Sequence, residues 1–327
     1  MKPRLPSHSR RGFTLVELIV VVSIVAVLIA ITLPVVSSVR KKGDMVSEIA
    51  AARQLMVAYA NYAAEHDNQL MPGYGNFPAK DDRGKDLHNP ASSRYPWRIA
   101  PYLGYDLSIL YGKAGSSRLK IDRTRDYASY VYAVSVAPAL GMNTVYVGGD
   151  YQMMNPESPR AIAAYGQFCV TRMAQAVKPA TLIVFASAWF GDQGERIPGY
   201  FKIEPPSFAA GRKWAKTLPP NAPPEASGHV DFRYDGRAVT AMLDGHVEML
   251  DFRQMNDMRR WSNLSAEANE SGWMPDGPGQ GSSSSSGSTS GGKPIDGNPI
   301  HGTPINGNPI EGTPINGNPI HDHSPDQ

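Results

Sequence analysis

The chain has 327 residues, of which 41% are hydrophobic and 19% charged, and its formal net charge is +2. A charge so close to zero gives no basis for nucleic-acid binding, which uses a basic patch or stripe. Cys169 is the only cysteine, so no intrachain disulfide can form, and its apolar neighbours indicate a buried side chain rather than a nucleophile. The composition fits one globular domain of about 200 residues beside segments of other kinds.

An apolar run near the N-terminus predicts a membrane-spanning helix. Residues 18–36 include no ionisable side chain, and their only hydroxyls are Ser23 and Thr32. A helix of this length rises about 28 Å, close to the ~30 Å hydrocarbon core of a bilayer. Glu17 stands at the edge of this run. A carboxylate there costs up to about 2.5 to 3.5 kcal/mol unless it is paired, so we expect a partner for it.

The residues before Glu17 suggest that partner. A leader with four cations (Lys2, Arg4, Arg10 and Arg11) ends in Gly12, and Phe13-Thr14-Leu15 follow. If the bond after Gly12 were cut, Phe13 would carry a positive amine four residues from Glu17. This arrangement resembles the N-terminus of type IV pilins and type II secretion pseudopilins, and the helix proline of that family recurs as Pro34.

The resemblance, which spans about residues 10 to 36, implies a route of processing and assembly. A prepilin peptidase would cleave between Gly12 and Phe13, Phe13 would be N-methylated, and Glu17 would pair with the amine of a neighbouring subunit. The implied partners are the peptidase, other pilin or pseudopilin subunits and the inner membrane. The implied location is a single pass with a cytoplasmic leader and a periplasmic domain, followed by an extracytoplasmic filament.

Two other interpretations of the N-terminus are an uncleaved signal anchor and an ordinary signal peptide. The apolar core is longer than the roughly 7 to 15 residues of a secretory signal, and residues 37–40 form a poor cleavage site. Flanking charge orients the helix weakly, because Arg40, Lys41 and Lys42 follow it. The cytoplasmic placement of the leader therefore rests on the motif.

After the membrane segment the helix is expected to continue and to pack on the domain. The apolar stripe that predicts this steps by three and four residues: Met45, Ile49, Ala52, Met56, Tyr59, Ala60 and Ala63. Gly43 is expected to loosen the joint between the two halves. The flanks and solvent side are expected to hold Asp44, Glu48, Arg53 and Asn61. The helix should end near residues 66–68, ahead of Pro72.

The middle of the chain gives weaker signals. Residues 73–90 predict a polar surface loop, and residues 95–103 a short aromatic segment that packs on the core. Carbohydrate stacking by Tyr95, Trp97 and Tyr102 is the alternative. Strands are expected at residues 130–136, 144–147 and 181–186, and short helices at residues 159–164 and 170–176.

The clearest sheet signal is a three-stranded meander. Residues 229–234, 238–243 and 246–250 read as strands, joined by turns at Asp235-Gly236 and Asp244-Gly245. The segment resembles a C-terminal motif of pseudopilin-like proteins, in which nine residues separate a histidine from Asp-Gly. Tyr234 holds the histidine position here.

The meander also contains metal-ligand residue types: His229, Asp231, Asp235, Asp244, His246 and Glu248. The resemblance brings in the calcium site of major pseudopilins. However, Asp-Gly turns and strand alternation explain the same residues, and the spacings of EF-hand and zinc sites are absent from the sequence. We therefore expect no cofactor, with calcium as the open alternative. The sequence also has no catalytic motif, which argues against an enzyme.

The end of the chain changes composition sharply. Residues 276–292 are rich in Gly and Ser, and pentads of the type Asn-Pro-Ile-x-Gly follow. One Ile in five residues cannot build a core, so we expect a disordered tail, with a stacked solenoid as the alternative.

Together these features predict an α+β, pilin-like fold. Its parts are a leader (1–12), a transmembrane and assembly helix (13–40), an amphipathic continuation (41–68), a globular domain on an antiparallel sheet (69–275) and the tail (276–327). The predicted function is a structural subunit of a type II secretion or type IV pilus-like filament. The alternative is a membrane-anchored binding module that uses the leader for delivery.

Overall fold

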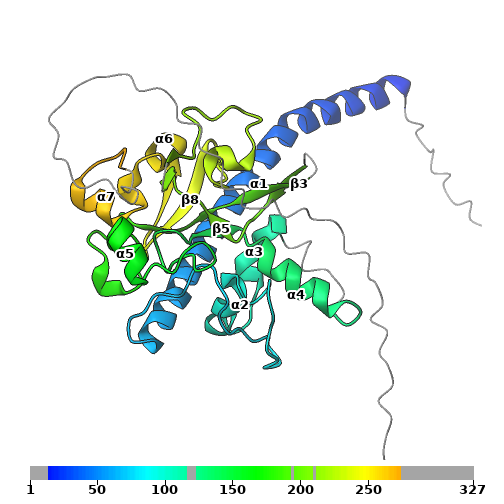
Figure 1. The fold of residues 1–327 in the computed structure, drawn as a ribbon. Coiled ribbons are helices and arrows are strands. Elements are labelled where there is room, and N and C mark those ends of the chain that lie inside the picture. The colour runs from blue at the N-terminus through cyan, green and yellow to red at the C-terminus, as the bar shows by residue number, and fades with distance from the viewer. Residues whose placement is uncertain (1–13, 116–122, 193–194, 209–210, 274–327) are drawn as a thin grey trace, which may run out of the picture. The chain divides into compact units, whose positions relative to one another are not determined.

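The computed structural model describes residues 14–115, 123–192, 195–208 and 211–273. The described part has this order of elements (Figure 1). Its α-helices are α1 (Leu15–Glu65), α2 (Tyr95–Ile99), α3 (Ser108–Gly115), α4 (Tyr127–Val136), α5 (Pro159–Tyr165), α6 (Phe252–Met255) and α7 (Asn263–Ala268). Its strands are β1 (Leu140–Asn143), β2 (Ile183–Ser187), β3 (Trp189–Asp192), β4 (Glu195–Pro198), β5 (Lys202–Ile203), β6 (Ser207–Phe208), β7 (Gly211–Arg212), β8 (Arg237–Met242) and β9 (Val247–Asp251). Short 3-10 helices are η1 (Ala100–Leu103), η3 (Met173–Gln175), η4 (Pro224–Ser227) and η5 (Met258–Arg260). The leader and the expected linker and repeats lie outside the described residues.

Helix α1 is a single element of 51 residues. It runs without a break through Gly43, so the expected joint at that glycine is wrong. It ends at Glu65, because Asp67 and Asn68 take positive φ values of 52° and 60° that a right-handed helix cannot contain. This end agrees with the predicted one, and the long N-terminal helix of the expected fold is confirmed.

The main sheet has five strands in the order β5-β1-β2-β8-β9. Strands β1 and β5 are parallel, and the other three pairs are antiparallel. Strands β8 and β9 form the predicted hairpin at Asp244-Gly245, with Val239 opposite Met249. Two smaller two-stranded sheets pair β3 with β4 and β6 with β7. The antiparallel-rich sheet of the α+β prediction is therefore present.

The first strand of the predicted meander is wrong. Within residues 229–234 only isolated bridges occur, at Val230 with Ala188 and at Tyr234 with Arg237. His229 has a φ of +65°, which breaks an extended strand at its start. The turn at Asp235-Gly236 is as predicted, because both residues have positive φ and two backbone hydrogen bonds of 3.0 Å join the residues on either side.

The structure also corrects two strands in the middle of the chain. The expected strand 130–136 is helix α4, which Asp126 caps by accepting a hydrogen bond of 3.0 Å from the Ser129 amide. The expected strand 144–147 is a turn, since the Asn143 side chain accepts from the Tyr146 amide at 3.3 Å. Strand β2 and helix α5 confirm two other predicted elements, whereas residues 170–176 contain only the 3-10 helix η3.

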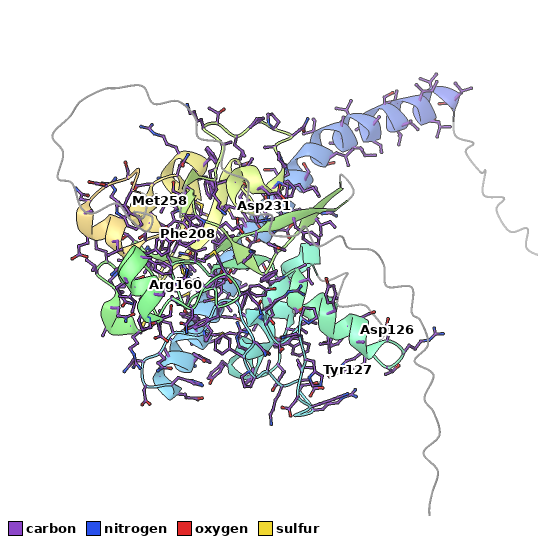
Figure 2. The ribbon with its side chains drawn as sticks, viewed as in Figure 1. Asp126, Tyr127, Arg160, Phe208, Asp231 and Met258 are labelled. Carbon is purple, nitrogen blue, oxygen red and sulfur yellow. The ribbon has the colours of Figure 1, made fainter. Side chains whose placement is uncertain are left out.

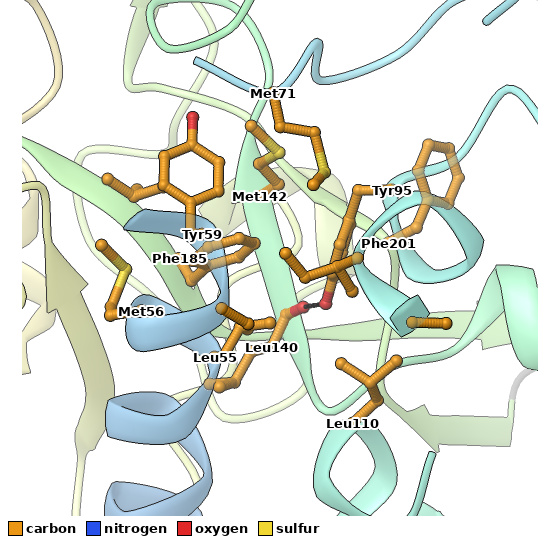
Figure 3. Close-up of a cluster of buried hydrophobic side chains, with 14 of the residues drawn as sticks. Leu55, Met56, Tyr59, Met71, Tyr95, Leu110, Leu140, Met142, Phe185 and Phe201 are labelled. Carbon is orange, nitrogen blue, oxygen red and sulfur yellow. Dashed lines mark hydrogen bonds between the residues drawn. The ribbon is translucent and has the colours of Figure 1, made fainter. Parts of the chain in front are cut away.

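The core lies on both faces of the main sheet. Neighbouring residues of β8 face opposite ways: Val239 joins a cluster with α1 and α2, and Ala238 joins one with α5, α6 and η5. The side chains of the first cluster interlock in Figure 3, where the ring of Tyr59 meets the ring of Phe185 edge-on at 5.6 Å. The sheet is thus shielded on each side, with the second half of α1 as part of one layer.

Most of the predicted helix stripe is in this core. Ala52, Met56, Tyr59 and Ala63 are buried, whereas Ala60 is exposed. The aromatic segment that follows is also core, because Tyr95 and Trp97 are 0% and 1% exposed. The hydroxyl of Tyr95 donates to the carbonyl of Leu140 at 2.6 Å, drawn as a dashed line in Figure 3. The packing interpretation of these two rings is confirmed, and they are closed to a stacked sugar.

Candidate assembly and anchoring site

The first half of α1 presents apolar side chains on all sides. Large hydrophobic residues from Leu15 to Val39 are exposed, and the rest of the described chain covers none of the most apolar stretch. Among the described residues, α1 is the one helix long and apolar enough to cross a membrane. The hydroxyl of Ser23 donates to the Ile19 carbonyl at 2.7 Å, and Thr32 bonds carbonyls one turn back in the same way. Both hydroxyls are therefore satisfied within the helix, as an apolar environment requires.

Glu17 and Thr14 close the start of this helix with a reciprocal cap. The backbone N and Oγ1 of Thr14 donate to Oε2 of Glu17 at 2.9 and 2.8 Å, and the Glu17 amide donates to Thr14 Oγ1 at 3.2 Å. The carboxylate thus satisfies donors at the positive end of the helix dipole. Glu17 is still exposed, and Gly12 and Phe13, the other predicted site residues, lie outside the described residues.

Glu48 anchors the second half of α1 to the sheet. The prediction that Glu48 faces solvent is wrong, since it is 5% exposed. Its Oε2 accepts from the hydroxyl of Tyr234 at 2.7 Å and lies 3.5 Å from Nη1 of Arg233, and its Oε1 accepts from the hydroxyl of Ser187. Burial and the nearby Glu48 charge raise the pKa of Tyr234, so the phenol stays a donor. Three groups from two segments therefore hold one helix position.

The charge of Glu48 is balanced by a chain of ions that leads away from the helix. Arg233 contacts the buried Asp231 at 3.2 Å, and Nη2 of Arg233 donates to the Ala188 carbonyl at 2.7 Å. Asp231, labelled in Figure 2, also accepts from Arg196, whose guanidinium lies 4.1 Å from the ring centroid of Trp189. Two carboxylates and two guanidinium groups make this cluster neutral, which buried charges require.

The sequence contains a signal for Glu48 that periodicity alone misreads. Glu48 comes three residues after Met45 and four before Ala52, so it lies on the apolar stripe itself. Its charge suggested a solvent position, whereas its place in the helix period indicated the core. Ser187 and Arg233 have no comparable local signal, because their role depends on contacts with residues far away in the chain.

The candidate metal ligands of the C-terminal segment contact protein groups. A ring nitrogen of His229 lies 3.2 Å from the Trp189 carbonyl, and Glu248 binds Arg260 at 2.6 Å. Asp244 lies 2.6 Å from His246, and Asp235 is an exposed turn residue. Over the described ranges no three His, Cys, Asp or Glu side chains come together as a metal site.

These features define a class of protein: an α+β domain carried on a helix whose first half is apolar all round. Residues 7–33 match the family model described as the prokaryotic N-terminal methylation motif. This motif is characteristic of type IV pilins and pseudopilins, so the chain has a pilin-type N-terminus. The match does not reach the Asp244-Gly245 turn. A search of curated proteins and a search of solved structures gave no match.

Proposed function

We propose that this chain is a structural subunit, of the pseudopilin or minor pilin type, in a type II secretion or type IV pilus-like filament. The observation that carries the proposal is the uncovered apolar surface of α1 between Leu15 and Val39, directly after a carboxylate held at the helix start. The methylation motif at residues 7–33 supports the same role. In this proposal residues 1–12 are a leader, 13–40 the assembly helix, 41–68 its continuation, 69–275 the globular domain and 276–327 the tail.

The apolar surface needs a cover at every stage. Lipid surrounds the helix in the inner membrane, with the leader in the cytoplasm and the domain in the periplasm. On assembly the helix passes into a bundle of like helices, which replaces lipid contacts with protein contacts of the same polarity. Transfer between two apolar surroundings costs little, so small additional contacts can decide whether a subunit enters the filament.

Glu17 supplies one such contact in this proposal. After cleavage by a prepilin peptidase, the methylated amine of Phe13 pairs with Glu17 of a neighbouring subunit. Both bonds from Thr14 end on Oε2, which leaves Oε1 without a hydrogen bond among the described residues. The helix cap and the amine can therefore use different oxygens. A buried pair of this kind fixes register more than it adds stability.

N-terminal mass spectrometry of the native protein tests the proposal. The expected mature chain begins at methylated Phe13. Recovery of protein that retains its first twelve residues would contradict it. The alternative would then stand: a membrane-anchored binding module, for which the polar cavity described below is the supporting observation. That alternative predicts stable monomers, whereas the proposed function predicts co-purification with a filament.

A further inference from the structure

A cavity of about 570 Å³ lies in the segment that the sequence showed only as a surface loop. Its lining consists of Asn76, Phe77, Pro78, Leu87, His88, Asn89 and Ser92. This volume is within the range of small-molecule sites, roughly 300 to 1,000 Å³. We propose that the cavity binds a neutral carbohydrate, a function separate from the filament role.

A buried arginine fixes the walls of this cavity. Arg98 of α2 is 6% exposed, and its Nη1 donates to the Ser92 carbonyl at 2.7 Å. Its Nη2 donates to the Pro72 and Gly73 carbonyls at 2.7 and 2.9 Å. The guanidinium also lies 5.6 Å from the ring centroid of Phe77. One side chain thus ties the chain on both sides of the cavity, which makes the cavity preformed and lowers the cost of ordering on binding.

The wall from Asn89 to Ser93 is further braced by its own side chains. Oδ1 of Asn89 accepts from the hydroxyls of Ser92 and Ser93 at 2.9 and 2.5 Å. This leaves the Nδ2 group of Asn89 free to donate. Across the described ranges, the amide of Asn76 and the ring of His88 make no hydrogen bond either, and all three side chains are exposed. These groups combine donors and acceptors, as neighbouring sugar hydroxyls do.

The charge of the lining selects against ionic ligands. None of the lining residues is Asp, Glu, Lys or Arg. The nearby cation of Arg98 already donates to three carbonyls. The exposed apolar surface of Phe77, with Pro78 and Leu87 beside it, suits the C–H face of a sugar ring. A peptide would instead need an apolar groove or a free strand edge, and the lining residues form neither.

The test uses the full-length processed protein in detergent, with saturation-transfer NMR followed by calorimetry. The probes are glucose, galactose, N-acetylglucosamine and cellobiose. Sorbitol is the open-chain control with similar hydroxyls, and glucuronate is the charged control. We expect at least one cyclic neutral sugar to bind, and to bind more tightly than sorbitol and glucuronate. Asn76→Ala, which removes two hydrogen-bonding atoms from the cavity, should weaken binding about threefold to tenfold.

Matched variants separate the site from general effects on the fold. Asn61→Ala, an exposed asparagine on α1, should leave binding unchanged. Absence of binding to every cyclic sugar would overturn the proposal, as would equal binding of sorbitol or equal affinity of the Asn76→Ala protein. Preferential binding of a peptide or of glucuronate would overturn it too. Filament co-purification is scored independently, so a failed sugar test leaves the proposed function intact, and the reverse also holds.

Discussion

The carboxylate of Glu48 in α1 accepts a hydrogen bond of 2.7 Å from the hydroxyl of Tyr234, 186 residues later in the chain. Tyr234 directly precedes the Asp235-Gly236 turn that leads into β8. It also occupies the position at which the resembling C-terminal motif has a histidine. In this chain that position serves as a hydrogen-bond donor that joins the long helix to the sheet.

Replacing Glu48 should destabilise the domain more than any exposed change on the same helix. Glu48→Leu leaves Ser187, Tyr234 and Arg233 without their shared acceptor in a buried place. We expect a loss of about 2 to 4 kcal/mol in the free energy of unfolding. Urea unfolding of the full-length protein in detergent measures it. The control is Glu65→Leu, an exposed position that should cost less than about 1 kcal/mol; equal losses would show that Glu48 is not an anchor.

Tyr234→Phe should reveal the coupling between the two residues. The variant removes one hydroxyl and should cost about 1 to 2 kcal/mol, because the lost hydrogen bond ends on a charged group. In the Glu48→Leu background the same change should cost clearly less, since its acceptor is already gone. A double-mutant cycle of unfolding free energies checks this. Strict additivity would mean that the 2.7 Å contact contributes no free energy.

Glu17→Leu should separate processing from assembly. The substitution removes a charge from the start of the apolar helix but leaves the leader and Gly12 unchanged, so we expect normal cleavage. Incorporation into filaments should fall at least tenfold, because the amine of the neighbouring subunit loses its partner. Immunoblots of membrane and sheared-filament fractions measure both steps. Filaments at normal yield would refute the pairing role of Glu17.

His229 should make stability depend on pH. Burial lowers the pKa of His229 below its ordinary 6.5, assisted by Lys202 and opposed by Glu204, Glu225 and the contact with the Trp189 carbonyl. The unfolded chain therefore takes up the proton first, so this contribution to stability is present above pH 6.5 and is lost as the pH falls from 6.5 towards the folded pKa.

The matched variant is His229→Asn, because asparagine tolerates the φ of +65° at this position. Between pH 7 and pH 5 the wild-type protein should lose more unfolding free energy than the variant, as measured by urea unfolding at each pH. Parallel pH profiles of the two proteins would contradict this expectation. Carboxylates that titrate in the same range affect both proteins equally and cancel in the comparison.

Cys169 should be inert towards thiol reagents in the folded protein. The side chain is 1% exposed, and burial, with Glu157 and Asp150 nearby, raises the pKa of the thiol. The reactive thiolate is therefore scarce at pH 8. Iodoacetamide labelling followed by mass spectrometry should modify Cys169 only after denaturation. Rapid labelling of the native protein would show that the site opens.

Some parts of the fold follow from neighbouring residues alone. The two Asp-Gly turns form as predicted, because the left-handed conformation that they need is a local property of those residues. Helix α4 was misread as a strand, since tyrosine and valine favour strands while their three-and-four spacing fits a helix. The cap from Asp126 and the burial of Tyr130 and Val134 decide that conflict in favour of the helix.

The sequence by itself determined the apolar helix, its acidic start and its pilin-type leader, because length, polarity and residue order within one segment carry that information. Only the tertiary structure placed Glu48 against Ser187 and Tyr234, and only it brought Arg98 behind the cavity at Asn76. Those contacts join residues far apart in the chain, and a charged side chain is tolerated in a core only where distant partners meet it. No pattern within a single segment specifies that meeting.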